Sequence, residues 1–226
     1  MHLFFLSLAG GLLVLDTTAV LQILISQPLV SCTILGWMAN DTAFGLHFGL
    51  LMQLLWVSQL PVGAARVAAG NLGSITGVLI ALQLKPLFPE YQNFLILAGL
   101  LSALIISYIG AHLNAALNQF NVTIFNRIFN QIEKGKISAI GRMTAAALAV
   151  KLALLTLLIY GFVIIGVYVL QFIKSGELAS INTYARYIEM AVIGAGIGLT
   201  LNLYKSRKAA AVFIAGIILG ILIFLI

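Results

Sequence analysis

Charged side chains are scarce in this sequence. Only 8% of the 226 residues are Asp, Glu, Lys or Arg, whereas 62% are hydrophobic, and the mean hydropathy is +1.13. A soluble domain usually has about 25% charged residues. The composition therefore excludes an ordinary soluble domain and predicts an all-α integral membrane protein. At roughly 20 residues per span, the chain has room for about six to eight transmembrane or re-entrant helical segments.

Cysteine and recognisable catalytic motifs are also scarce. The single cysteine, Cys32, excludes an intramolecular disulfide and a CxxC metal site, and no paired His or Cys stands at metal-ligand spacing. The sequence contains no Walker loop, HExxH or GxSxG motif. We therefore expect no cofactor, no metal and no enzymatic activity on this chain. The basic residues behind the net charge of +6 lie mainly between apolar runs. In such positions basic residues set membrane topology, so the charge is not a signal for nucleic-acid binding.

One apolar stretch, 27–77, is interrupted repeatedly by proline, glycine and polar residues. Its helix-breaking residues include Pro28, Pro61 and Gly63, and it also carries Asn40, Asp41, His47, Gln53, Gln59, Arg66 and Asn71. Backbone that is not helical at membrane depth must be buried in protein or line a watery cavity. Ionisable groups at that depth are costly and usually face a pathway. This broken stretch is therefore the predicted solute site.

Five polar side chains are candidates for binding the solute: Gln22, Gln53, Gln59, Arg66 and Asn71. Amides suit a polyhydroxyl solute because they donate and accept hydrogen bonds, although they also link helices to one another. Arg66 needs water, a carbonyl or a carboxylate, and Asp16 and Asp41 are its candidate partners.

Five other residues are expected to act as structural or gating positions: Asp16, Pro28, Asp41, Pro61 and Gly63. Asp16 is interpreted as a helix break or cap, with a cavity-facing carboxylate as the alternative. Asp41, within Asn40–Thr42, is expected to cap a helix that continues to about residue 60. His47 is interpreted as a packing residue rather than a ligand.

The chain is expected to form one membrane domain, 1–226. We divide it into a half with broken helices and re-entrant arms (1–84), a region with one span (85–117), an amphipathic cytoplasmic loop (118–142) and C-terminal spans (143–226). The loop has apolar residues every four positions and four basic residues, which place it inside by the positive-inside rule. The segment 174–186 is expected to be an outside loop that precedes a span at 187–204.

The broken stretch also follows a spaced pattern of specific residues: Pro28, Leu29, Val30, Cys32, Thr33, Gly36, Asp41, Gly45, Gly49, Pro61, Val62, Gly63 and Ala64. In this order they resemble the IIC membrane component of the mannose–fructose–sorbose family of the phosphoenolpyruvate-dependent sugar phosphotransferase system. The polar segment from Asn126 to Arg142 is similar to the loop between the two membrane regions of that family. The resemblance covers nearly the whole chain.

The resemblance implies a specific role. IIC subunits pair with a IID membrane subunit and assemble as oligomers of IIC–IID units in the bacterial inner membrane, which IIC crosses several times. The sugar binds in a membrane cavity at the broken helices and moves inward. IIA phosphorylates a soluble IIB protein, and IIB then phosphorylates the sugar. The phosphoryl chemistry therefore lies on partner subunits.

Three departures from the family pattern bear on this role. Gln27 stands where the family has Arg, and Gln53 stands where it has Glu. The acidic residue expected near Val67–Ala69 is missing, with Arg66 beside it. A carboxylate accepts stronger hydrogen bonds than an amide does. The sequence thus leaves three hypotheses: a sugar-translocating IIC subunit with altered specificity, a degenerate IIC-like scaffold or regulatory subunit, and an unrelated small transporter or membrane structural protein.

Overall fold

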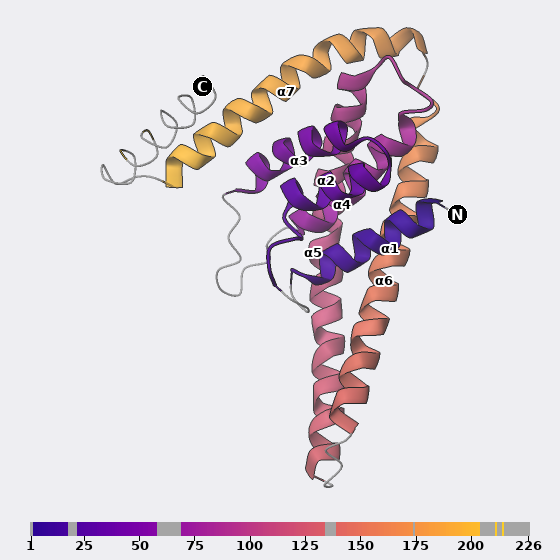
Figure 1. Ribbon diagram of the computed structural model, residues 1–226, viewed down its shortest axis with the longest axis vertical. Coiled ribbons are helices and arrows are strands. Elements are labelled where there is room, and N and C mark those ends of the chain that lie inside the picture. The colour runs from indigo at the N-terminus through magenta and orange to yellow at the C-terminus, as the bar shows by residue number, and fades with distance from the viewer. Residues whose placement is uncertain are drawn as a thin grey trace.

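The computed structural model describes residues 2–17, 22–57, 69–133, 139–173 and 175–203, together with 211 and 214. Within these ranges the chain is helical, with no strand, which confirms the all-α prediction. Figure 1 shows the arrangement of the described helices. They are α1 (His2–Leu15), α2 (Pro28–Met38), α3 (Thr42–Trp56), α4 (Gly70–Leu84), α5 (Gln92–Glu133), α6 (Ala139–Leu170) and α7 (Ser175–Leu203).

The first four helices are short, as the broken pattern predicts. They have 14, 11, 15 and 15 residues. At 1.5 Å per residue the longest is roughly 22 Å long, less than the hydrocarbon thickness of about 30 Å. Pro28 opens α2, where its missing N–H removes no helical hydrogen bond. None of these helices is therefore long enough to cross that thickness on its own.

Helix α4 lies at the centre of the bundle. It contacts α1, α2, α3, α5 and α6, and every residue from Leu72 to Leu82 is buried. A helix that is apolar on all sides is expected in such a position. Its hydroxyl groups donate within the helix, from Ser74 to the Gly70 carbonyl and from Thr76 to the Leu72 carbonyl. The buried hydroxyl groups of α4 thus find hydrogen-bond acceptors within their own helix and need none from another helix.

Glycines let α2 and α3 cross with their backbones in contact. A Cβ atom at Gly45 would lie 2.4 Å from the Cys32 carbonyl oxygen and 2.8 Å from the Gly36 Cα atom. A Cβ atom at Gly49 would lie 2.7 Å from the Pro28 carbonyl oxygen. Gly45 and Gly49 are four residues apart, and small residues at this spacing let two helices approach closely. The partner is α2 of the same chain.

Asp41 fixes the start of α3. Its Oδ1 atom accepts a hydrogen bond from the Phe44 N–H at 3.3 Å, so the predicted cap is confirmed. Its other oxygen pairs with the ammonium group of Lys85, just after α4. The helix ends at Trp56 rather than near residue 60. Asp41 therefore ties the first turn of α3 to the last turn of α4.

Helices α5 and α6 run side by side along the longest axis of the molecule and extend beyond the shorter helices (Figure 1). They contain two segments long and apolar enough to cross a membrane, 92–113 and 141–170. At 42 residues, α5 is roughly 63 Å long, about twice the hydrocarbon thickness. Helix α5 continues without interruption to Glu133, so no break separates the expected span ending at 117 from the polar segment that follows it.

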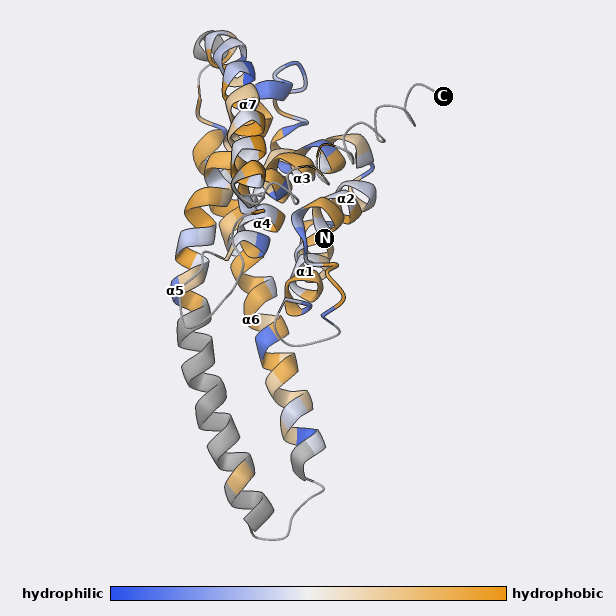
Figure 2. Ribbon diagram, turned by 90° about the vertical axis from the view of Figure 1, so that its left-hand side faces the viewer, coloured by the Kyte–Doolittle hydropathy of each residue, from blue (hydrophilic) through white to orange (hydrophobic). Residues whose placement is uncertain are grey.

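Helix α7 crosses the upper end of the bundle in Figure 1 and contacts α3 and α5. At its crossing with α3, a Cβ atom at Gly196 would lie 2.5 Å from the Leu54 Cβ atom. The Glu189 carboxylate lies 2.6 Å from His47 Nε2 of α3, so His47 links α3 to α7 through a hydrogen bond on the exposed surface. The expected loop at 174–186 is wrong from Ser175 onward, because α7 begins there. Figure 2 shows hydrophobic residues along most described helices.

Candidate functional site

Polar side chains gather where α1 ends, α2 begins, and α3 and α4 approach the connecting loop. We call these residues the loop cluster: Asp16, Thr17, Ser26, Gln27, Gln53 and Asn71. They come from four places in the sequence and meet at the edge of an apolar bundle, where Asp16 and Ser26 are buried and the others are partly or fully exposed. The arrangement follows from the breaks after Leu15 and before Pro28, because the described residues between them, 16–17 and 22–27, are not helical and contact the first turn of the central helix.

Asp16 holds the α1–α2 connection in place. Its carboxylate accepts hydrogen bonds from the backbone N–H groups of Ile23, at 2.9 Å, and Ser26, at 3.2 Å. The residue is only 3% exposed. Backbone N–H groups at this depth need a partner, and a carboxylate is a strong acceptor. Of the two interpretations of Asp16, the structure shows the helix break, with the carboxylate directed at its own loop.

Asn71 attaches this loop to the first turn of α4. Its Nδ2 atom donates to the Thr17 hydroxyl at 3.1 Å and to the Ser26 hydroxyl at 3.2 Å. Asn71 and Thr17 keep part of their surface exposed, whereas Ser26 is buried. The amide thus connects buried and accessible parts of the loop cluster.

Gln53 reaches the same loop from α3. Its Oε1 atom accepts from the Leu29 N–H at 3.4 Å, and its Nε2 atom donates to Gln27 Oε1 at 3.3 Å. The Leu29 N–H is one of the unpaired donors at the start of α2, so Gln53 caps that helix from another segment. Both glutamines are partly exposed.

An indole ring lies close to the loop cluster. Trp56 Nε1 donates to the Ser74 hydroxyl at 3.2 Å, and a Cβ atom at Gly70 would lie within 2.8–3.0 Å of the ring atoms. The last turn of α3 therefore packs against the first turn of α4, which also carries Asn71. Trp56 adds an aromatic surface to a region that is otherwise polar.

The structure brings several of the predicted residues together. Gln53 and Asn71 belong to the loop cluster, Asp16 and Pro28 border its loop, and Gln22 lies in that loop, exposed and with φ 54°. Asp41 lies apart, at the opposite end of α3, where it pairs with Lys85. Gln59, Pro61, Gly63 and Arg66 fall outside the described residues, between Val57 and Ala69.

The sequence did not predict Ser26 or Trp56 as part of the site. Ser26 lies directly before Gln27 and Pro28, at the start of the recognised pattern, so its position was a usable signal. Trp56 comes four residues after Met52 in an apolar helix, where an aromatic side chain is usually a packing residue. Its contact with α4 is visible only in three dimensions. Among the described residues, no group of three His, Cys, Asp or Glu side chains is placed to hold a metal.

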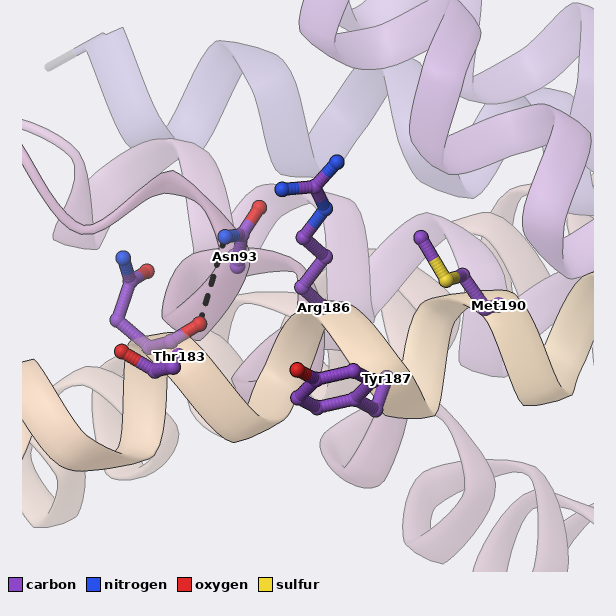
Figure 3. A pocket seen from close by; sticks show the side chains of 6 residues that line it. Asn93, Thr183, Arg186, Tyr187 and Met190 are labelled. Atoms are coloured by element: carbon purple, nitrogen blue, oxygen red, sulfur yellow. Dashed lines mark hydrogen bonds between the residues drawn. The ribbon is translucent and has the colours of Figure 1, made fainter.

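A second polar region lies between the start of α5 and the first half of α7. A cavity of about 310 Å³ is lined there by Asn93, Asn182, Thr183, Arg186, Tyr187 and Met190 (Figure 3). Asn93 Nδ2 donates to the Asn182 carbonyl oxygen at 3.3 Å, and Asn182 Oδ1 accepts from the Phe94 N–H at 3.0 Å. These bonds join α5 to α7, and the cavity shares no residue with the loop cluster.

The described residues thus form short, broken helices, a loop cluster and a long α5–α6 pair. The family described as the sorbose-specific IIC component of the phosphotransferase system matches residues 1–225. This chain belongs to that family. Membership makes it a membrane transport subunit and removes the unrelated small transporter from the three hypotheses. A search of curated proteins found no match.

Two solved structures share the fold. One, described as a membrane protein, is 16% identical with a TM-score of 0.70, and the match covers 96% of this chain and 84% of that chain. The other is the mannose transporter ManYZ in complex with microcin E492, at 17% identity and a TM-score of 0.59, with the same coverage of the two chains. At such low identity these likenesses concern the fold.

Proposed function

We propose that this IIC subunit forms the membrane path for a sugar, and that the sugar contacts the loop cluster. The observation that carries the proposal is the meeting of Gln53 and Asn71, from two different helices, with the partly exposed connection between α1 and α2 at the edge of an apolar bundle. Amides and hydroxyls both donate and accept hydrogen bonds, as sugar hydroxyls do. Next to an otherwise apolar bundle, such a group of partly exposed side chains suits a neutral polyhydroxyl solute.

Asp16 and Trp56 complete the proposed site in different ways. The Asp16 carboxylate is already engaged by two backbone N–H groups, so it positions the loop and leaves sugar recognition to the amides and hydroxyls. The Trp56 ring offers an apolar face next to the first turn of α4. Sugar rings have apolar C–H faces as well as hydroxyls. Gln59 and Arg66 stand between α3 and α4 in the sequence, outside the described residues, and we propose that they line the same path.

The proposed subunit works with partners. Family membership and the fold shared with the ManYZ transporter support pairing with a IID-like membrane subunit in an oligomer of IIC–IID units. We propose that the complex lies in the bacterial inner membrane and that soluble IIA and IIB proteins deliver the phosphoryl group to the sugar. The segment around 134–142 carries Lys134, Lys136 and Arg142, and we propose that it faces the cytoplasm.

A second function is favoured by the bonding of Gln53. Its amide oxygen caps α2 and its amide nitrogen binds Gln27, so both ends of the side chain serve the fold. Gln53 stands where the resemblance expects an acidic residue. If its role is entirely internal, the chain is a IIC-like scaffold or regulatory subunit that no longer translocates sugar.

Phosphorylation of a sugar panel separates the two functions. The chain is expressed with its IID-like and IIA/IIB partners in cells lacking other sugar phosphotransferase permeases. Labelled hexoses, hexosamines and ketoses are then tested for phosphoenolpyruvate-dependent phosphorylation. We expect one class of sugar to be phosphorylated, and only when this chain is present. An assembled complex that phosphorylates none of them would favour the scaffold.

A further inference from the structure

We propose that the cavity between α5 and α7 binds the phosphate headgroup of an anionic phospholipid. This cavity is the one lined by Asn93, Arg186 and Tyr187 among others, about 310 Å³ in volume. Sites for small molecules usually have volumes of about 300–1,000 Å³, so it is large enough for a headgroup. The inference is independent of the sugar path, because the loop cluster contributes no residue to it.

The cavity lies where two elements change from polar to apolar. The segment before α5 carries Lys85 and Glu90, Asn93 lies in the first turn of α5, and an apolar run starts at Phe94. In α7 the polar side chains continue to Glu189, and an apolar run starts at Met190. Such transitions mark the depth of the lipid headgroups, where Tyr is enriched. Both Tyr184 and Tyr187 stand at this level, 67% and 64% exposed.

Arg186 supplies the charge that a phosphate requires. Among the described side chains the ion pairs are Asp41–Lys85 and His47–Glu189, so Arg186 has no carboxylate partner there. Its side chain is exposed and extends from α7 on the same side as Asn93 (Figure 3). A guanidinium group binds phosphate oxygens through two parallel hydrogen bonds. The Tyr187 hydroxyl and the Asn182 amide are neighbouring donors in the cavity wall.

The cavity walls are held in place without a ligand. Asn182 accepts hydrogen bonds from Asn93 and from the Phe94 N–H, which fix the start of α5 against α7. Beyond the cavity, α7 continues with exposed apolar side chains at Ile193, Ile197 and Leu201. A headgroup in the cavity would therefore have its acyl chains beside an apolar helix surface. This continuity favours a lipid over free phosphate.

The test measures lipid binding by the full chain in the assembly in which it is purified from membranes. The assembly is placed in phosphatidylcholine nanodiscs, and binding of fluorescent phosphatidylglycerol is compared with that of fluorescent phosphatidylcholine. We expect a preference for phosphatidylglycerol that falls about tenfold in Arg186→Gln, the size of effect expected for one charge-assisted interaction. Arg186→Lys should lose less, because it keeps the charge but not the paired hydrogen bonds.

Arg142→Gln is the matched control, since Arg142 is also exposed but lies near the start of α6, far along the chain from the cavity. Its lipid binding should be unchanged. If the Arg186 and Arg142 variants lost the preference for phosphatidylglycerol equally, general surface charge would explain the binding and the proposal would be overturned. No preference for phosphatidylglycerol would also overturn it. Displacement of the lipid by inorganic phosphate at similar concentrations would identify a site for a soluble anion instead.

Discussion

Gly45→Ala is expected to destabilise the fold strongly, lowering the melting temperature of the purified chain by roughly 6–12 °C. The added Cβ atom would lie 2.4 Å from the Cys32 carbonyl oxygen. Because this oxygen belongs to the backbone of α2, a change in one side chain cannot relieve the clash. Overpacking typically costs about 1–3 kcal/mol, and backbone contacts lie at the upper end. For a chain of this size, each kcal/mol lowers the melting temperature by about 2–4 °C.

Gly194→Ala provides the matched control for this prediction. Gly194 also lies in a helix, α7, but a Cβ atom there would meet no atom within 4 Å. Because Ala is the better helix former by about 1 kcal/mol, the variant should be as stable as the original chain or slightly more stable. Equal melting temperatures for the two variants would contradict the close backbone contact between α2 and α3.

Asn71→Ala is expected to lower sugar uptake by about tenfold or more. The substitution removes both hydrogen bonds that tie the α1–α2 loop to α4, together worth about 1–3 kcal/mol, and it removes an amide from the proposed sugar site. The measurement is the initial rate of sugar phosphorylation by cells that express the complete transport system. Melting of the purified complex shows whether the variant is still assembled.

Gln83→Ala is the control for Asn71→Ala. Gln83 is a partly exposed amide near the other end of the same helix, away from the loop cluster. It should transport at the original rate. An assembled Asn71→Ala complex that also transports at the original rate would contradict a role for the loop cluster in the sugar path.

The sequence was sufficient to predict the broken half of the fold. Pro28 and Asp41 are local signals, one for the first turn of a helix and one for its cap, and both act at the predicted positions. The boundary at 117 and the loop at 174–186 could not be predicted in the same way. Polar residues lower the hydropathy at both places, which suggested that a helix ended there. A helix nevertheless continues through polar residues when its own backbone hydrogen bonds remain intact.

The site was predictable residue by residue but not as an arrangement. Gln53 and Asn71 were selected because amides are unusual in an apolar stretch, and the structure places both in the loop cluster. Their partners Ser26 and Gln27 depend on how α3 and α4 pack against the α1–α2 loop. Asp41 was one of two candidate partners for Arg66, and among the described residues it pairs with Lys85. Contacts between distant segments are fixed by packing, which spacing along one chain does not encode directly.

Protection of a thiol at position 17 tests the proposed sugar path most directly. The only cysteine, Cys32, is fully buried, so Thr17→Cys introduces the one thiol that a water-soluble maleimide should label. The variant is first shown to phosphorylate the sugar selected by the panel. We expect that sugar to slow labelling in proportion to its occupancy, and a sugar outside the transported class to have no effect. An unchanged labelling rate with the transported sugar at saturation would contradict the proposal that the sugar contacts the loop cluster.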